Sequence, residues 1–118
     1  MSQQIPESDW KVLRELEPVL LERFCKRALA YITEAANDSA QTRHQGFLQI
    51  FQLTQKQNND LALAFDDIRR SNALPKLMAM RSLGLLTDEE FMRFRPDTRS
   101  LIDESVSIRE RAHYEENI

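Results

Sequence analysis

The sequence predicts an all-α protein, a small helical bundle of five or six helices around one long central helix at about residues 40–70. The 118 residues include only 2 Gly and 4 Pro, whereas Leu, Ala, Glu, Gln and Arg are abundant. Turn-forming residues are therefore scarce and helix formers plentiful. Apolar residues also recur at spacings of three and four, the period of an amphipathic helix. The length predicts a single domain, 1–118, with flexible ends at about 1–7 and 110–118.

The first two predicted helices are separated by Pro18. Ser8 can cap a short first helix, which we expect to end before Pro18 because proline lacks an amide hydrogen. Pro18 then opens the second helix, which the polar run 37–39 ends. That second helix has a broad apolar face, which we expect to be buried; it comprises Leu20, Leu21, Phe24, Cys25, Ala28, Leu29, Tyr31 and Ile32.

The long helix predicted at 40–70 carries the most regular apolar seam: His44, Phe47, Phe51, Thr54, Asn58, Leu61, Phe65 and Ile68. A continuous helix of this length is a rod of roughly 46 Å, whereas a compact domain of this size is only about 35 Å across. The helix must therefore break near 57–60, or project and meet a partner helix. In the second case Asn58 would fix the register of the pair. The alternative places Asn58 at the solvated end of a monomer's core.

The stretch RSLGLLTDEEFMRF, residues 81–94, predicts a tight corner between two helices. A short helix at 74–83 ends at Gly84, which can adopt the left-handed conformation that closes a helix. Thr87 and Glu90 then form the capping box of the next helix. Pro96 ends that helix and opens the last one, whose thin apolar face comprises Leu101, Ile102, Val106 and Ile108.

Residues 74–95 resemble the short C-terminal (SHOCT) helical hairpin of bacterial proteins. The matching features are Leu77, the run Leu83-Gly84-Leu85-Leu86-Thr87, and Glu89-Glu90-Phe91. This chain departs from the pattern in continuing past the hairpin and in placing Pro96 where the second helix of that module would continue. The resemblance implies a packing or oligomerisation element, and it transfers no catalytic residue.

Charge and hydropathy exclude several classes of partner. The net charge is −3 and no segment has a strong positive excess, so we expect no nucleic acid partner. No apolar run approaches the ~20 residues of a membrane span. The first seven residues lack the features of a secretory signal, and the lone Cys25 cannot form an internal disulfide. These observations predict a cytoplasmic protein that does not bind membranes, and the resemblance to the SHOCT hairpin implies a bacterial type.

Few residues suggest chemistry. His44 and His113 are far apart and have no partner at metal-ligand spacing, so we expect no metal and no cofactor. Cys25 lies on an apolar helix face, where a thiol is inert. A packed or capping role for His44 accounts for it better than catalysis. We therefore predict that the protein is not an enzyme, although a chemical role for Cys25 or His44 stays open.

The function that these observations favour is a protein–protein interaction or oligomerisation module, with a homodimer as the expected state. The candidate interaction residues lie on the long helix and at the corner: Phe47, Phe51, Asn58, Leu61, Phe65, Leu85, Leu86, Phe91 and Met92. The alternative is a transcription-associated regulator with a helix-turn-helix-like corner at 74–94. Its second helix would face DNA phosphates with the carboxylates of residues 88–90, which the electrostatics oppose. An enzyme is the third alternative.

Overall fold

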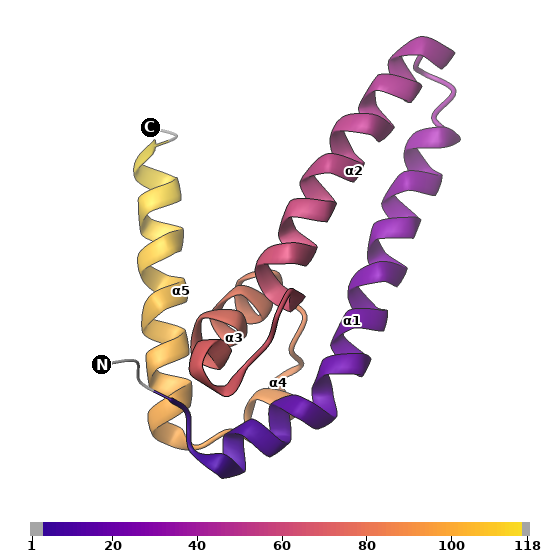
Figure 1. Ribbon diagram of the computed structural model, residues 1–118. Helices are drawn as coiled ribbons and strands as arrows, with labels where there is room; N and C mark the ends of the chain where they lie inside the picture. The colour runs from indigo at the N-terminus through magenta and orange to yellow at the C-terminus, as the bar shows by residue number, and fades with distance from the viewer. Residues whose placement is uncertain (1–3, 117–118) are drawn as a thin grey trace.

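The computed structural model describes residues 4–116, and for residues 108–116 it describes the helix alone. Within that part of the chain there are five α-helices, one 3₁₀ turn and no strand. The elements are α1 Glu7–Ala36, α2 Arg43–Phe65, η1 Arg70–Asn72, α3 Ala73–Ser82, α4 Asp88–Phe91 and α5 Pro96–Glu116 (Figure 1). The predicted all-α class is confirmed for the described residues.

α1 continues through Pro18, so the prediction of a short first helix that ends before this proline is wrong. A proline inside a helix removes one amide donor and crowds the carbonyl four residues earlier, which produces a bend. Figure 1 shows α1 bending in its first half. Leu13, Leu16 and Leu20 are buried on both sides of the proline. Packing of both halves against one core therefore keeps the helix continuous.

α2 begins at Arg43 because a capping box precedes it. The Thr42 hydroxyl accepts the amide hydrogen of Gln45 at 3.1 Å, and the Gln45 side chain accepts the amide hydrogen of Thr42 at 2.9 Å. The helix is unbroken across residues 57–60, where the ammonium of Lys56 contacts the carboxylate of Asp60 at 2.9 Å. The break considered for 57–60 is therefore not present.

α2 ends at Phe65, so it is shorter than the helix predicted at 40–70. The Nζ of Lys76 in α3 donates to the carbonyls of Ala62 and Leu63, at 3.2 and 2.9 Å, and so satisfies two carbonyls of the last turn. Asp67 then turns the chain with a left-handed φ of 54°. The carbonyl partners come from a later helix, so a tertiary contact sets the end of α2.

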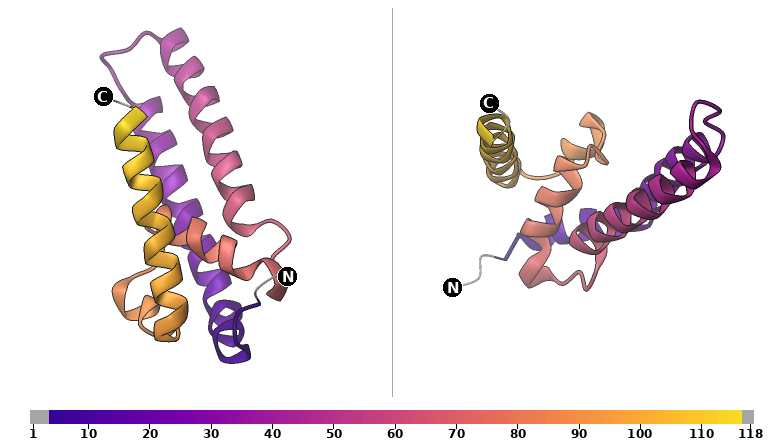
Figure 2. Two further views of the ribbon diagram at one scale, coloured as in Figure 1. Left: turned by 90° about the vertical axis from the view of Figure 1, so that its left-hand side faces the viewer. Right: turned by 90° about the horizontal axis from the view of Figure 1, so that it is seen from above.

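The element at the centre of the fold is the short helix α3, and the predicted bundle around a central helix at 40–70 is not confirmed. α3 contacts α1, α2 and α5, and the view from above shows it between α5 and the α1–α2 hairpin (Figure 2). The buried core lies around it: Ile5, Leu13, Leu16, Leu20, Ala64, Ala73, Leu77, Ala79, Met80, Leu85, Leu86, Phe91, Phe94 and Ile102.

A buried carboxylate of α1 connects this helix to the start of α5. Asp9 of α1 is 1% exposed, and it accepts the amide hydrogen of Arg95 at 3.0 Å and the hydroxyl of Thr98 at 2.6 Å. These donors lie at the start of α5, where amide groups have no partner within the helix. Asp9 therefore caps α5 from α1 and fixes the angle between the two helices.

The hairpin of α1 and α2 projects from the body of the molecule, the part around α3 that contains the buried core (Figure 1). The radius of gyration is 16.6 Å and the molecule extends over 51 × 35 × 27 Å, whereas a compact chain of this length has a radius of gyration of about 13.5 Å. The elongation agrees with the expectation of a helix that extends beyond a compact domain.

Two further predictions concern the ends of the chain and membranes. Residues 1–3 and 117–118 of the predicted flexible ends lie outside the described residues, and flexibility there stays a prediction, as does the single domain. Within the described residues, no helix combines the length and apolar character that crossing a membrane requires.

Candidate interaction face of the α1–α2 hairpin

The outer part of α2 presents aromatic side chains to solvent. Phe47 is 69% exposed and Phe51 is 56% exposed, and their spacing of four places them on one helix face. Thr54 and Asn58 continue this face at spacings of three and four, and both are exposed. These four positions are the second to fifth members of the predicted seam, and nothing in the described chain covers them.

α1 adds a parallel row of apolar residues. Leu21 and Leu29 are exposed, at 38% and 63%, and Cys25 lies half-buried between them at spacings of four. The side chains of Arg23 and Arg27 contact the corner. Each of these arginines is two residues from a member of the row, which corresponds to a rotation of about 200° around the helix. The row therefore lies on the side of α1 opposite the corner. The expectation that this apolar face is buried is wrong for Leu21 and Leu29, and also for Tyr31, which is 59% exposed.

The two rows lie on the same side of the hairpin. The opposite side holds a groove of ≈ 360 Å³ against the corner, lined by Arg27 and Tyr31 of α1 and by Lys56 and Asp60 of α2, among others. Asn58 is two residues from both Lys56 and Asp60, so it points away from this groove. We call the free side the hairpin face and define it by eight residues: Leu21, Cys25, Leu29, Ile32, Phe47, Phe51, Thr54 and Asn58.

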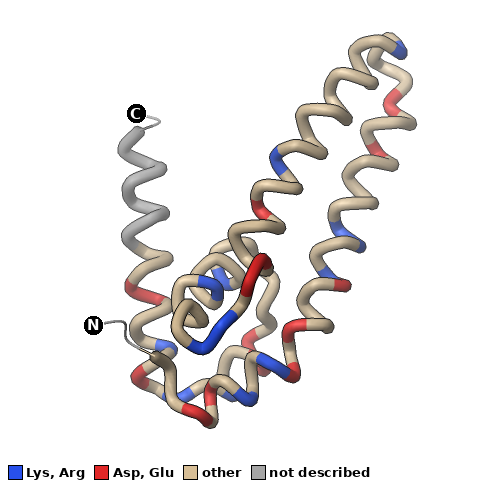
Figure 3. Tube along the Cα trace, viewed as in Figure 1, with Lys and Arg blue, Asp and Glu red and all other residues tan. Residues whose placement is uncertain are grey.

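The hairpin face lies on a part of the chain that has no formal charge. No Lys, Arg, Asp or Glu occurs from His44 to Gln55 of α2, or from Ala28 to Thr33 of α1. Figure 3 shows the corresponding length of α2 without a charged position between Arg43 at its start and the lysine and aspartate near its lower end. Depletion of charge around apolar and aromatic side chains is the composition of an interface core.

The contact between α1 and α2 uses a different face of α2, one residue out of phase with the predicted seam. Gly46 is buried against the tip of α1, where a Cβ would lie 3.7 Å from the carbonyl oxygen of Ala35. Further along, Gln57 is half-buried and donates to the carbonyl of Ala28 at 3.2 Å. Small and polar side chains therefore face α1, and the aromatic ones face solvent.

The other predicted residues of α2 lie at the end nearer the body. Leu61 is half-buried. Phe65 packs edge-on against Phe24 of α1, with ring centroids 6.3 Å apart and an interplanar angle of 64°, and it lies beside the core. Phe65 therefore anchors the base of the hairpin and is not part of the free surface.

The predicted corner residues serve mainly the chain's own core. Leu85, Leu86 and Phe91 are buried, at 1%, 6% and 5% exposure. Met92 is 61% exposed, and its sulfur accepts a hydrogen bond from Nη1 of Arg99 at 2.8 Å. The three buried side chains therefore pack in the chain's own core, and Met92 is the one member of this set that lies on the surface.

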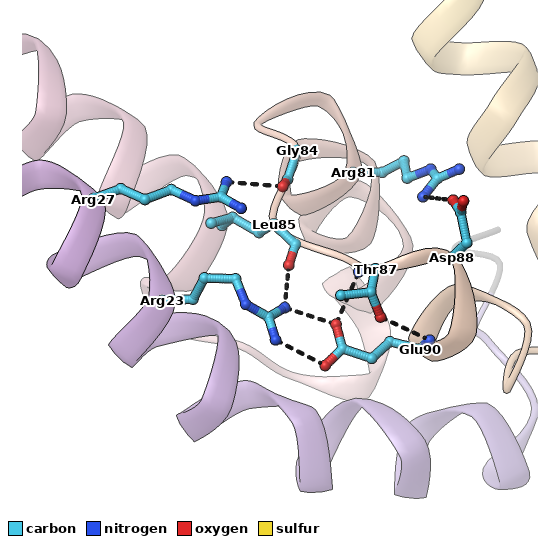
Figure 4. A network of polar contacts seen from close by, with 8 residues as sticks. All are labelled: Arg23, Arg27, Arg81, Gly84, Leu85, Thr87, Asp88 and Glu90. Atoms are coloured by element: carbon cyan, nitrogen blue, oxygen red, sulfur yellow. Dashed lines mark hydrogen bonds and ion pairs between the residues drawn. The ribbon is translucent and has the colours of Figure 1, made fainter.

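The corner itself forms as predicted and is fastened to α1 (Figure 4). Gly84 has a left-handed φ of 68°, and the Thr87–Glu90 capping box is present. Two nitrogens of Arg23 donate to the Glu90 carboxylate at 2.7 and 3.1 Å, and Arg23 also donates to the carbonyl of Leu85. The hydrogen bonds from Arg23, followed by those from Thr87, lower the pKa of Glu90 to about 2.

Sequence reasoning missed Arg23 and Arg27, whose guanidinium groups reach the corner across 62 and 57 residues of chain. It also missed Asp9. No local pattern marks such long-range contacts between side chains and backbone carbonyls or amides. The apolar row of α1 was recognised from its spacing, but its exposure could not be read from that spacing.

Cys25 and His44 are the residues for which a chemical role stays open. Cys25 is half-buried on the hairpin face, and His44 is exposed at the start of α2. Among the described residues, no group of three or more His, Cys, Asp or Glu side chains could hold a metal ion. No protein-family model, curated protein or solved structure matches this chain.

Proposed function

We propose that this chain is a protein–protein interaction module of the cytoplasm, which docks a protein partner through the hairpin face. The observation that carries the proposal is the exposure of Leu29, Phe47 and Phe51 on one side of a projecting, locally uncharged hairpin. Monomeric proteins seldom leave contiguous apolar patches of this kind in water. Rigid aromatic side chains are also the anchors that dominate binding energy at interfaces.

The division of side chains within the hairpin supports this function. From residue 21 to residue 63, the buried residues are Ala35 and Gly46, and none of this stretch belongs to the buried core. Leu21, Leu29, Phe47 and Phe51 of the same stretch are exposed on the free side. Burial of a Phe side chain contributes roughly 1.5–3 kcal/mol. The exposed aromatic side chains of the outer hairpin do not contribute this stabilisation within the single chain.

The DNA-reading alternative has less support. The helix after the turn, α4, has four residues, whereas a recognition helix must extend along the major groove. Glu90 is paired with Arg23, and the Asp88 carboxylate lies 3.7 Å from Arg81, so the corner is occupied by contacts within the chain. Retention on duplex DNA at low salt that falls steeply with added salt would revive this alternative.

The experiment that tests docking uses a photoreactive side chain on the hairpin face. Benzoylphenylalanine replaces Phe51 in the full chain, expressed in its own cells, and irradiation is followed by mass analysis. We expect a covalent adduct with a protein. The same replacement at Gln52, which is exposed on another side of α2, should give none. Equal labelling from both positions, or none from position 51, would refute the proposal.

A further inference from the structure

We propose that the occupant of the hairpin face is a second copy of this chain, packed with its α2 antiparallel to the first α2 about a two-fold axis. This inference rests on the proposed function and names the partner. The first reason is the spacing of the exposed positions of α2. Phe47, Phe51, Thr54 and Asn58 follow intervals of four, three and four, which read the same in both directions. An antiparallel copy therefore presents the same pattern in register, as a two-fold interface requires.

The second reason is the order of large and small side chains within that pattern. A two-fold axis crossing α2 between residues 52 and 53 sets Phe51 opposite Thr54 of the second copy. The same axis sets Phe47 opposite Asn58. Each aromatic ring thus meets a smaller side chain, which is the arrangement that lets two helix faces interdigitate. Asn58 lies at one end of the paired stretch in each copy, opposite Phe47.

The third reason is electrostatic. The charged residues of α2 are Arg43, Lys56 and Asp60, and the axis places them opposite Ala62, Gln49 and Gln45 of the second copy. No pair of like charges meets along α2, so no repulsion between the two α2 helices opposes the association. A partner with a charged surface, such as nucleic acid, would gain nothing from this uncharged face.

The fourth reason is the area available. The chain exposes 8399 Å² of accessible surface, whereas a compact monomer of 13.8 kDa would expose about 6,600 Å². The difference is about 1,800 Å², and a standard interface covers roughly 800 Å² on each partner. The projecting hairpin contributes to this excess, and Leu21 and Leu29 of α1 extend the contact beyond α2.

The oligomeric state tests the inference directly. Light scattering on the purified full chain should give twice the monomer mass of 13.8 kDa at micromolar concentration. Phe51→Glu should return the monomer mass because it places a charge in the seam. Gln52→Glu adds the same charge on another exposed side of α2 and should remain dimeric. Circular dichroism should show the same helix content for both variants as for the wild type, since both positions are exposed.

A disulfide experiment tests the direction of packing. In a Cys25→Ser background, chains carrying Phe47→Cys are mixed with chains carrying Asn58→Cys and oxidised. Antiparallel packing in the proposed register predicts a mixed disulfide. It predicts no disulfide between two chains that carry the cysteine at position 47, because those positions would be about 16 Å apart along the axis. The opposite result, a disulfide between two position-47 cysteines, would overturn the antiparallel arrangement.

The outcomes separate the two proposals. A wild-type chain that stays monomeric to high micromolar concentration would overturn the second-copy inference. If photocrosslinking from position 51 then captured a different protein, the docking function would stand without self-association. A monomer that also gave no crosslink at position 51 would refute both.

Discussion

The ion pair between Arg23 and Glu90 is the main polar link between the hairpin and the corner, and Glu90→Gln isolates its contribution. Two nitrogens of Arg23 contact the two carboxylate oxygens, and the side chains are 26% and 17% exposed. Glutamine has the same shape and can still accept the amide hydrogen of Thr87, which lies 2.9 Å from Oε1 in the wild type. The substitution therefore removes the charge while keeping the capping box.

The expected loss follows from the pKa of Glu90. Lowering this pKa from 4.5 to about 2 corresponds to at most about 3.4 kcal/mol of preference for the folded state. Solvent reaches part of the pair, and screening reduces the expected contribution to about 1–2 kcal/mol. For a chain of this length, such a loss lowers the melting temperature by about 3–8 °C.

The dependence on pH gives a second, independent readout. The folded pKa of Glu90 lies below its unfolded value, so the folded state holds the proton less readily than the unfolded state. The stabilisation is therefore complete above about pH 5, falls as the pH drops, and is lost near pH 2. The difference in free energy of unfolding between wild type and Glu90→Gln should narrow over that window.

Urea unfolding followed by circular dichroism at pH 7, 4 and 3 measures both quantities. Glu89→Gln is the matched control, because Glu89 lies next to Glu90 in the same turn and its side chain is exposed. It should cost less than about 0.5 kcal/mol, since it loses a helix-dipole interaction alone. If Glu90→Gln is no more costly than Glu89→Gln at pH 7, or if its cost does not change with pH, the reasoning fails.

The remaining predictions concern the cap of α5 and the two glycines. Asp9→Ala should lower the free energy of unfolding by about 2–3 kcal/mol, because it leaves the donors of Arg95 and Thr98 buried without a partner; Asp9→Asn should cost less in the same urea titration. Gly84→Ala should cost about 1 kcal/mol, since φ there is 68°. Gly46→Ala should be neutral or slightly stabilising, because Gly46 is helical and an added Cβ would make an ordinary contact.

The parts of the fold that were predicted correctly are those set by a few neighbouring residues. The closure of α3 at Gly84 needs one residue without a Cβ, and the start of α4 needs Thr87 and Glu90 three apart. Each of these signals is complete within a single turn of chain. They could therefore be read without knowing what the corner packs against.

The helix boundaries that were predicted wrongly depend on distant contacts. Pro18 bends α1 without ending it, because leucines on both sides belong to one core. α2 stops at Phe65, where Lys76 from the next helix satisfies the last carbonyls. The bond between Lys76 and α2 spans 13 or 14 residues and joins a side chain to backbone carbonyls, so apolar periodicity does not reveal it.

The candidate site shows a different limit of prediction from sequence. Two faces of α2, one residue apart, are both suited to packing against another helix. The strongest apolar periodicity selects Phe47 and Phe51, while the contact with α1 uses Gly46 and Gln57. Hydrophobicity alone favours the aromatic face, whereas close helix packing favours the small one. The sequence therefore indicated the apolar periodicity of Phe47 and Phe51, and it could not indicate that these side chains face away from α1.

The same separation of faces explains why the hairpin can project at all. A pair of helices joined by small side chains can lie close together, but such a contact buries little apolar surface and contributes little stability. Ala35 and Gly46 are the buried residues of the outer hairpin, and the capping box at Thr42 adds local support; under the proposed function, a partner that covers Phe47 and Phe51 supplies the rest. A sequence selected only for a monomeric hairpin would turn those aromatic residues inward. Their outward position is the arrangement expected when the second half of the core is supplied by another chain.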